Sequence, residues 1–278
     1  MKAINDITNK IFLGDARSVL HTFPSECVDM CITSPPFYNQ RSYGGLEFEI
    51  GSEKSVGEYL NQIGNVFDEV KRVLKPTGTC WVNIGDKYHN GELYGVPERF
   101  VVHMMLKEWR RFNTIIWRKP NTFTGSSKKR FNQDFEYLYA FSKNDSYYFD
   151  QQYEPYKTLY KSFDYTGKAK KNYKSDGAQD PSDAKRSILR SMATGKGRIK
   201  RCVWSIVHGS SAHTASFPRD LVHSPILAGT PLGGLVLDPF VGSGTSLRVA
   251  SECGRRYVGI DLNPKSVEMA QRLVDISC

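Results

Sequence analysis

The sequence has no apolar run that approaches the roughly 18 uninterrupted residues of a membrane helix, and its first six residues carry no apolar signal segment. We therefore expect a cytoplasmic protein with no membrane partner. The 6 cysteines form no Cys-x-x-Cys pair, which predicts reduced thiols in place of a disulfide framework or a metal site. A Pro-Cys dipeptide is also absent.

Acidic residues are scarce in one central segment. Between Arg118 and Arg201 the sequence holds 19 Lys and Arg residues against 9 Asp and Glu, whereas the rest of the chain holds 19 against 20. The formal net charge of +9 therefore comes from this segment. A solvated charged face is the plain explanation, but such faces normally mix signs, so the one-sided surplus favours a polyanionic partner.

Hydrophobic periodicity predicts alternating strands and helices, and hence an α/β fold. Regular patterning fades from about residue 150 to residue 201, which predicts an inserted region, and residues 38–52 are expected to form a loop over a crevice. Lys75 to Gly78 are expected to end a helix. Strands are expected near residues 10–16, 28–32, 79–84, 112–117, 134–141, 203–206, 234–238 and 257–261, and helices near residues 16–21, 55–74, 97–109, 218–228, 245–253 and 264–274.

The segment Thr33-Ser34-Pro35-Pro36-Phe37 follows a predicted buried strand. Proline fixes φ and cannot donate a backbone hydrogen bond, so the strand must stop and the chain must leave the sheet as a rigid loop. Open α/β sheets bind ligands at the carboxyl ends of their strands. The loop offers a hydroxyl, free carbonyls and an aromatic ring, a set that suits a planar base with an exocyclic amino group. Taken alone, the same residues are more simply a proline turn closed by a core phenylalanine.

A second motif favours the ligand site. Residues 234–261 are typical of a strand, a glycine loop, a helix and a second strand that ends in Asp261. Gly242 and Gly244 allow a ligand to approach the backbone closely, and the helix that opens at Thr245 directs free N–H groups at it. Asp261 lies about 20 residues beyond Gly242, where a carboxylate can accept ribose hydroxyls. The loop is neither Gly-x-Gly-x-x-Gly nor a P-loop with its lysine, which favours an adenosine compound other than a nicotinamide cofactor or ATP.

Together these motifs resemble the β group of S-adenosylmethionine-dependent DNA amino-methyltransferases. Residues 238–245, Asp-Pro-Phe-Val-Gly-Ser-Gly-Thr, resemble the loop around the methionine part of the cofactor, and residues 33–37 match the catalytic motif. The catalytic motif precedes the cofactor loop, which is the circularly permuted order of this group. The cofactor-binding residues implied by the resemblance are Asp15, Thr33, Phe217, Pro218, Asp238, Phe240, Gly242, Gly244, Thr245 and Asp261.

The resemblance implies a doubly wound Rossmann-like methyltransferase sheet. Residues 1–149 would form its catalytic half, residues 150–201 a target-recognition insertion, and residues 202–278 its cofactor-binding half. It also implies S-adenosyl-L-methionine as cofactor, double-stranded DNA as partner, no metal, and rotation of the target base out of the duplex. A cognate restriction endonuclease and a homodimer are compatible with this interpretation.

The implied catalytic residues are Ser34, Pro35, Pro36 and Phe37. Phe37 would stack on the flipped base, while Ser34 Oγ and a carbonyl near Pro35 would accept hydrogen bonds from its amino group. The geometry holds the nitrogen lone pair toward the methyl group, so orientation does most of the catalytic work. In a polar loop of the basic segment, Lys128, Lys129 and Arg130 are the expected phosphate contacts, with a solvated loop as the plain alternative.

The target base is left open by these residues. Ser-Pro-Pro resembles the cytosine-N4 enzymes and Asp-Pro-Pro-Tyr is commoner among adenine-N6 enzymes, so cytosine is favoured. Phe37 departs from the usual tyrosine by lacking a hydroxyl. Enzymes that methylate carbon 5 of cytosine need a Cys nucleophile after Pro, which this chain lacks. The remaining alternatives are an RNA methyltransferase and a non-catalytic nucleic-acid-binding module, and the substrate, duplex DNA or structured RNA, separates them.

Overall fold

The computed structural model of the chain describes residues 2–40, 45–122, 128–155, 197–207 and 218–275. The chain divides into a large unit, residues 1–150 with 202–278, and a small unit, residues 151–201. In the small unit, strands β8 (Tyr153–Glu154) and β9 (Arg198–Ile199) pair antiparallel. The Glu154 carboxylate there accepts hydrogen bonds from Nε of Arg198 and of Arg201, each at 2.8 Å.

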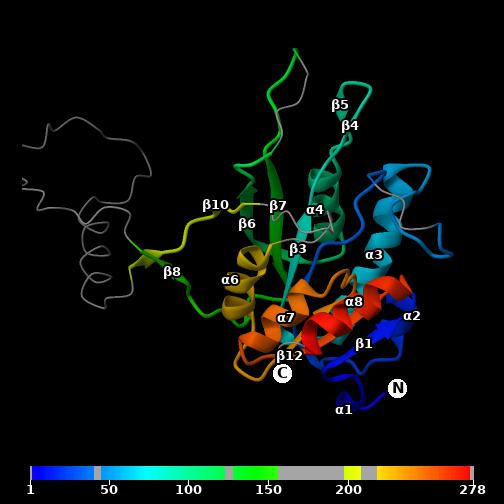
Figure 1. Cartoon of the computed structure of the whole chain (residues 1–278), viewed down its shortest axis with the longest axis vertical. Helices are drawn as coiled ribbons and strands as arrows, with labels where there is room; N and C mark the ends of the chain where they lie inside the picture. The colour runs from blue at the N-terminus through cyan, green and yellow to red at the C-terminus, as the bar shows by residue number, and fades with distance from the viewer. Residues whose placement is uncertain (1, 41–44, 123–127, 156–196, 208–217, 276–278) are drawn as a thin grey trace, which may run out of the picture. The chain divides into compact units, whose positions relative to one another are not determined.

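In the described part of the large unit, eight strands form one mixed sheet (Figure 1) in the order β1-β12-β11-β2-β3-β7-β6-β10. Neighbouring strands run parallel except where β7 pairs antiparallel with β3 and β6. The predicted α/β sheet is confirmed. Its strands are β1 (Lys10–Leu13), β2 (Val28–Thr33), β3 (Leu74–Ile84), β6 (Arg110–Arg118), β7 (Phe135–Ser142), β10 (Val203–Ser205), β11 (Leu235–Asp238) and β12 (Arg256–Asp261).

Helices cover both faces of the sheet, and the central strands β2 and β11 are buried on both sides. In β2, Val28 and Cys31 join one hydrophobic core, and Met30 and Ile32 join the other. Figure 1 shows α6, α7 and α8 grouped in front of the sheet. The helices of the first core are α2 (Ala16–His21), α3 (Val56–Val73) and α4 (Val96–Leu106), those of the second are α6 (Arg219–Gly229), α7 (Thr245–Glu252) and α8 (Pro264–Asp275), and the short α1 (Ile4–Ile7) precedes β1.

Strands β2 and β3 each differ in one feature from a simple apolar strand. Asp29, inside β2, accepts hydrogen bonds from Lys75 Nζ at 2.7 Å and from the Leu235 N–H at 2.8 Å. This carboxylate therefore ties β2 to β3 and β11. The helix α3 ends at Val73, directly before residues 75–78, as predicted. The strand that was expected from residue 79 instead begins at Leu74, and its register with β2 shifts between Leu74 and Thr79, in the stretch that contains Pro76.

Several strand ends meet at one edge of the sheet, where the candidate site lies. The carboxyl ends of β2, β3 and β6 meet the amino end of β7 there, because β7 runs opposite to its neighbours. A hairpin of β4 (Tyr88–His89) and β5 (Glu92–Leu93) follows β3, and residues 119–134 connect β6 to β7. Figure 1 shows the hairpin and the described part of the second connection extending from the sheet in the same direction. The sequence analysis did not predict the hairpin.

Candidate active site

The proline loop is held from both sides. The Pro36 carbonyl accepts a 2.9 Å hydrogen bond from the hydroxyl of Tyr59, a buried residue of α3. The Phe37 ring lies against Gly85 so closely that a Cβ added at Gly85 would come within 2.9 Å of the ring. Glycine at position 85 therefore makes room for the ring, and the loop leaves β2 in a defined conformation.

Ser34 lies at the end of a chain of polar groups that crosses three strands. Its hydroxyl donates a 3.2 Å hydrogen bond to Oδ1 of Asn83, a buried residue of β3. Asn83 Nδ2 donates to Glu136 Oε2 at 3.1 Å and to the Tyr137 carbonyl at 3.0 Å. Lys119 completes the chain by pairing with the other Glu136 oxygen, Oε1.

These contacts fix the direction of the Ser34 hydroxyl. Both hydrogens of the Asn83 amide are taken by Glu136 and Tyr137, so its oxygen must face Ser34. The Ser34 proton then points at Asn83, which leaves the lone pairs of Ser34 Oγ for another donor. Sequence reasoning missed Asn83, Glu136 and Lys119. A polar asparagine inside an otherwise apolar strand was the one available signal.

The glycine loop between β11 and α7 has the backbone that its sequence predicts. Gly242 has φ +52° and Gly244, which caps α7, has φ +89°, both in the left-handed region. A Cβ at Gly244 would lie 2.8 Å from Cα of Ala270 in α8, so glycine lets the two helices pack closely. At Gly242 the nearest atom to an added Cβ is 4.0 Å away, so this part of the loop is open to a ligand.

Asp238 joins the end of β2 to the glycine loop. Its buried carboxylate accepts hydrogen bonds from Thr33 Oγ1 at 2.6 Å, from the Phe240 N–H at 3.0 Å, and from Ser246 Oγ in α7. Burial raises the pKa of this carboxyl to about 6, although the three hydrogen bonds act in the opposite direction. Because its three hydrogen bonds all come from the protein, the Asp238 carboxylate fixes the end of β2 relative to the glycine loop and α7.

Asp261 and Asp15 cap backbone N–H groups at the same edge. Asp261 accepts from the Gly242 N–H at 2.8 Å and from the Asn263 N–H at 2.9 Å, and burial raises its pKa against the lowering effect of these bonds. Asp15 is the N-cap of α2 and accepts from the Ser18 N–H at 2.8 Å. A carboxylate has about four lone-pair sites, so Asp15 can still accept a hydrogen bond from a ligand. Asp261 is also hydrogen-bonded by the Ser266 side chain and the Leu262 backbone.

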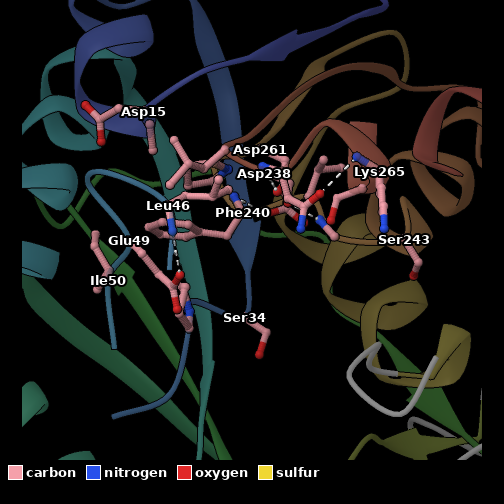
Figure 2. Close-up of a pocket in the computed structure, with 18 of the residues that line it drawn as sticks. Asp15, Ser34, Leu46, Glu49, Ile50, Asp238, Phe240, Ser243, Asp261 and Lys265 are labelled. Carbon is pink, nitrogen blue, oxygen red and sulfur yellow. Dashed lines mark hydrogen bonds between the residues drawn. The ribbon is translucent and has the colours of Figure 1, made fainter. Parts of the chain in front are cut away.

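A cavity of about 380 Å³ brings these groups together (Figure 2), a size in the range of small-molecule sites. In Figure 2, Asp15 and Ser34 lie on opposite sides of Phe240. Leu46 and Ile50, from the predicted loop over the crevice, also line the cavity. Of the predicted residues, those lining it are Asp15, Ser34, Pro36, Asp238, Phe240, Gly242, Thr245 and Asp261.

The other predicted residues have different positions. Thr33 is hydrogen-bonded to Asp238, and Gly244 lies against Ala270 of α8. The residues that line the cavity do not include Thr33, Pro35, Phe37 or Gly244. Pro218 caps α6, away from the lining, and Phe217 lies outside the described residues.

The cations proposed for phosphate contact are exposed and lie in the connection between β6 and β7. The Arg130 guanidinium stacks over the Tyr88 ring at 3.7 Å, while Lys128 and Lys129 precede it. Among the described residues, no helix is both long and apolar enough to cross a membrane.

Comparison with known proteins gives consistent matches along the chain. A family model described as DNA methylase matches residues 28–272. The type II methyltransferase M.Cfr9I of Citrobacter freundii is 32% identical over 291 residues, which cover 94% of this chain and 85% of that protein. The type II methyltransferase M.SmaI of Serratia marcescens is 31% identical over 296 residues, which cover 95% of this chain and 90% of that protein.

Solved structures show the same fold. The PvuII DNA methyltransferase, described as cytosine-N4-specific, superposes with a TM-score of 0.68 at 20% identity and covers 97% of this chain and 91% of its own. TTHA0409 of Thermus thermophilus, proposed as a DNA modification methylase and solved with S-adenosyl-L-methionine, gives a TM-score of 0.63 at 22% identity, with 96% and 95% covered.

Proposed function

Because the chain belongs to the DNA methylase family, we propose that it moves a methyl group from S-adenosyl-L-methionine to the exocyclic N4 of a cytosine turned out of duplex DNA. The observation that carries this proposal is the Ser34 hydroxyl, held as a hydrogen-bond acceptor by Asn83 at the wall of a cavity of nucleoside size. An acceptor in that position suits an amino group whose nitrogen gains a methyl group, because its hydrogens become more acidic as the S–C bond breaks and a neutral thioether leaves. The proton that the nitrogen loses passes to water.

The cavity fits the cofactor by the chemistry of its lining. Gly242 leaves open space beside the backbone, and Thr245 opens a helix whose first N–H groups suit a carboxylate. Asp261 and Asp15 would accept hydroxyl or amino hydrogens, and Phe240 offers an apolar face. S-adenosyl-L-methionine supplies an activated methyl group when bound, so the protein has only to bind, orient and exclude water.

The catalytic loop would then orient the base. Phe37 would stack on the flipped ring, and Ser34 Oγ with the Pro35 carbonyl would accept from the amino group. These contacts hold the nitrogen lone pair toward the methyl group, and such alignment accounts for a large part of the rate in transfer reactions. As positive charge develops on the nitrogen, the acceptors bind its hydrogens more tightly than in the ground state.

The same proposal covers the rest of the chain. We infer the circularly permuted order of the β group, with the catalytic loop ahead of the cofactor loop, and a target-recognition role for residues 150–201. Lys128, Lys129 and Arg130 are proposed to contact phosphates, which suits their exposure. A cognate restriction endonuclease and a homodimer stay predictions, to be tested by co-purification and by light scattering.

Support for cytosine comes from the Ser-Pro-Pro-Phe motif and from the fold shared with a cytosine-N4-specific enzyme. Both cytosine and adenine carry an exocyclic amine beside a ring nitrogen, so loop geometry does not separate them. Adenine N6 is the alternative, since the family includes enzymes of both kinds.

The test uses labelled S-adenosyl-L-methionine and unmethylated DNA of mixed sequence. The DNA is digested, and the labelled nucleoside is identified by mass and by retention against standards. N4-methylcytosine that is lost in Ser34→Ala and kept in Ser146→Ala, a matched serine in the turn after β7, supports the proposal. Label on adenine N6 would overturn the choice of base, and label on structured RNA alone would overturn the choice of substrate.

A further inference from the structure

Phe131 has the most exposed large apolar side chain in the described part of the chain, with 97% of its surface open to solvent. Single exposed apolar residues are common on protein surfaces, so exposure alone carries little weight. What singles out this ring is its location, the way its segment is anchored, and the charges beside it.

Phe131 lies next to the catalytic loop. It lines a groove of about 430 Å³ together with Gln40, Asp86 and Tyr88. The Gln40 N–H donates to the Phe37 carbonyl at 3.4 Å, and its side chain donates to the Asp86 carbonyl at 3.2 Å. One wall of the groove is therefore hydrogen-bonded to the backbone of Phe37, the residue that we expect to stack on the target base.

The segment that carries Phe131 is anchored on both sides. Before it, the Arg130 guanidinium lies 3.7 Å from the centre of the Tyr88 ring. After it, the Asp134 carbonyl accepts a 2.6 Å hydrogen bond from the Lys119 N–H, and Arg118 Nε donates to the Asp134 carboxylate at 3.2 Å. A ring presented from such a backbone loses little further freedom when it binds.

The charges around Phe131 suit a nucleic acid. The sequence has no Asp or Glu between Glu108 and Asp134, and Lys128, Lys129 and Arg130 directly precede the ring. Cations beside an apolar ring match a duplex, which offers phosphates to the cations and a base stack to the ring.

We propose that Phe131 is a wedge that enters the duplex beside the target base and fills the stack when that base turns out. This inference rests on the proposed function. A base that leaves the duplex breaks its stacking contacts, and an aromatic ring in the gap restores part of them. Phe131 would lower the cost of opening the duplex and would touch neither the cofactor nor the reacting amino group.

The test compares two duplexes that contain a methylated sequence mapped with the wild-type enzyme, one fully paired and one mispaired at the target base. On the paired duplex we expect Phe131→Ala to lower kcat/KM by on the order of 10- to 100-fold, the range of one stacking contact. On the mispaired duplex the loss should be roughly threefold or less, because that base is already partly open. Phe131→Trp should keep most of the wild-type rate on both.

Two controls separate this effect from damage to the fold. Leu232→Ala removes another exposed apolar side chain, 79% open, in the turn before β11 at the opposite edge of the sheet, and it should change neither rate. Cofactor affinity, measured by calorimetry, should be the same in wild type and Phe131→Ala. In a duplex with 2-aminopurine at the target, the fluorescence rise on binding should shrink in Phe131→Ala.

An equal loss of kcat/KM on both duplexes, or no loss on the paired one, would overturn the wedge. The proposed function would still stand in that case, because the wild-type enzyme methylates the DNA. A change of molecular mass in Phe131→Ala by light scattering would also overturn it, and would assign the ring to contact between copies of the chain. Absence of methylation by the wild type on any DNA would instead overturn the proposed function itself.

Discussion

Asn83 should control catalysis through Ser34 alone. Its amide oxygen accepts the Ser34 proton, and its orientation is fixed by Glu136 and the Tyr137 carbonyl. In Asn83→Ala the Ser34 hydroxyl has no fixed acceptor, so it rotates and spends part of its time with the proton toward the substrate. The substrate amino group then meets a donor where it needs an acceptor.

The size of the effect follows from the hydrogen bonds that the substitution removes. A hydrogen bond between neutral groups contributes about 0.5–1.5 kcal/mol and one to a charged group about 1.5–3 kcal/mol. Asn83→Ala removes two of the first kind and one of the second, so it should lower the free energy of unfolding by about 2.5–6 kcal/mol. Misorientation of one acceptor should raise the activation barrier by about 1–2 kcal/mol, or roughly 5- to 30-fold in rate. Ser34→Ala removes the acceptor itself and should cost at least as much.

A double-mutant cycle in single-turnover methylation provides the assay. If Asn83 acts only by orienting Ser34, then adding Asn83→Ala to Ser34→Ala should cause no further loss of rate. Losses that multiply would refute the reasoning, because they would mean that Asn83 touches the substrate or the cofactor directly. An unchanged rate in Asn83→Ala would refute it as well.

Asn83→Asp separates orientation from stability. Aspartate keeps an acceptor for Ser34, but it cannot donate to Glu136 or to the Tyr137 carbonyl, and it places two carboxylates side by side. We therefore expect a stability loss at least as large as in Asn83→Ala with a smaller loss of rate. Thermal unfolding measured beside single-turnover rates checks both.

Three further predictions concern the cofactor side. Burial raises the pKa of Asp238 to about 6 from an ordinary value of 3.8, so the folded state binds this proton more tightly than the unfolded state. This carboxyl alone should make unfolding about 1 kcal/mol easier at pH 7 than at pH 5, a difference that denaturant titration should find missing in Asp238→Asn. Gly244→Ala places a side chain on a left-handed residue and against Ala270, so it should lower the free energy of unfolding by about 1–3 kcal/mol in thermal unfolding. Gly242→Ala should weaken cofactor binding more than it lowers stability. Equal stability losses in the two variants would contradict this. Asp261→Asn should weaken cofactor binding in calorimetry by on the order of tenfold, and an unchanged affinity would rule out its role.

Local features of the fold were predictable because their causes are local. A helix was expected from about residue 55, and the Ser55 hydroxyl accepts from the Glu58 N–H at 3.1 Å at the start of α3. The glycine loop was predicted from spacing, and both Gly242 and Gly244 take the backbone conformations that glycine favours. Spacing and capping depend on neighbours within a few residues, which the sequence displays directly.

The groups behind Ser34 could not be predicted in the same way. Asn83, Glu136 and Lys119 come from or follow three different strands, and they meet only because β7 lies antiparallel between β3 and β6. No residue spacing encodes that order of strands. Phe131 could not be predicted for another reason, because an exposed ring in a polar loop leaves no periodic pattern in the sequence.

The contact between Thr33 and Asp238 explains why the same site can form whichever of the two motifs comes first along the chain. The two residues are 205 positions apart, yet β2 and β11 pair in parallel and a 2.6 Å hydrogen bond joins the two side chains where the strands end. The proline loop and the glycine loop thus both begin one residue beyond a shared hydrogen bond. Methyl transfer needs donor and acceptor held within a fraction of an ångström, and paired strands supply that constraint better than mobile side chains do. What the chemistry requires is adjacency in the sheet, and either motif can come first in the sequence.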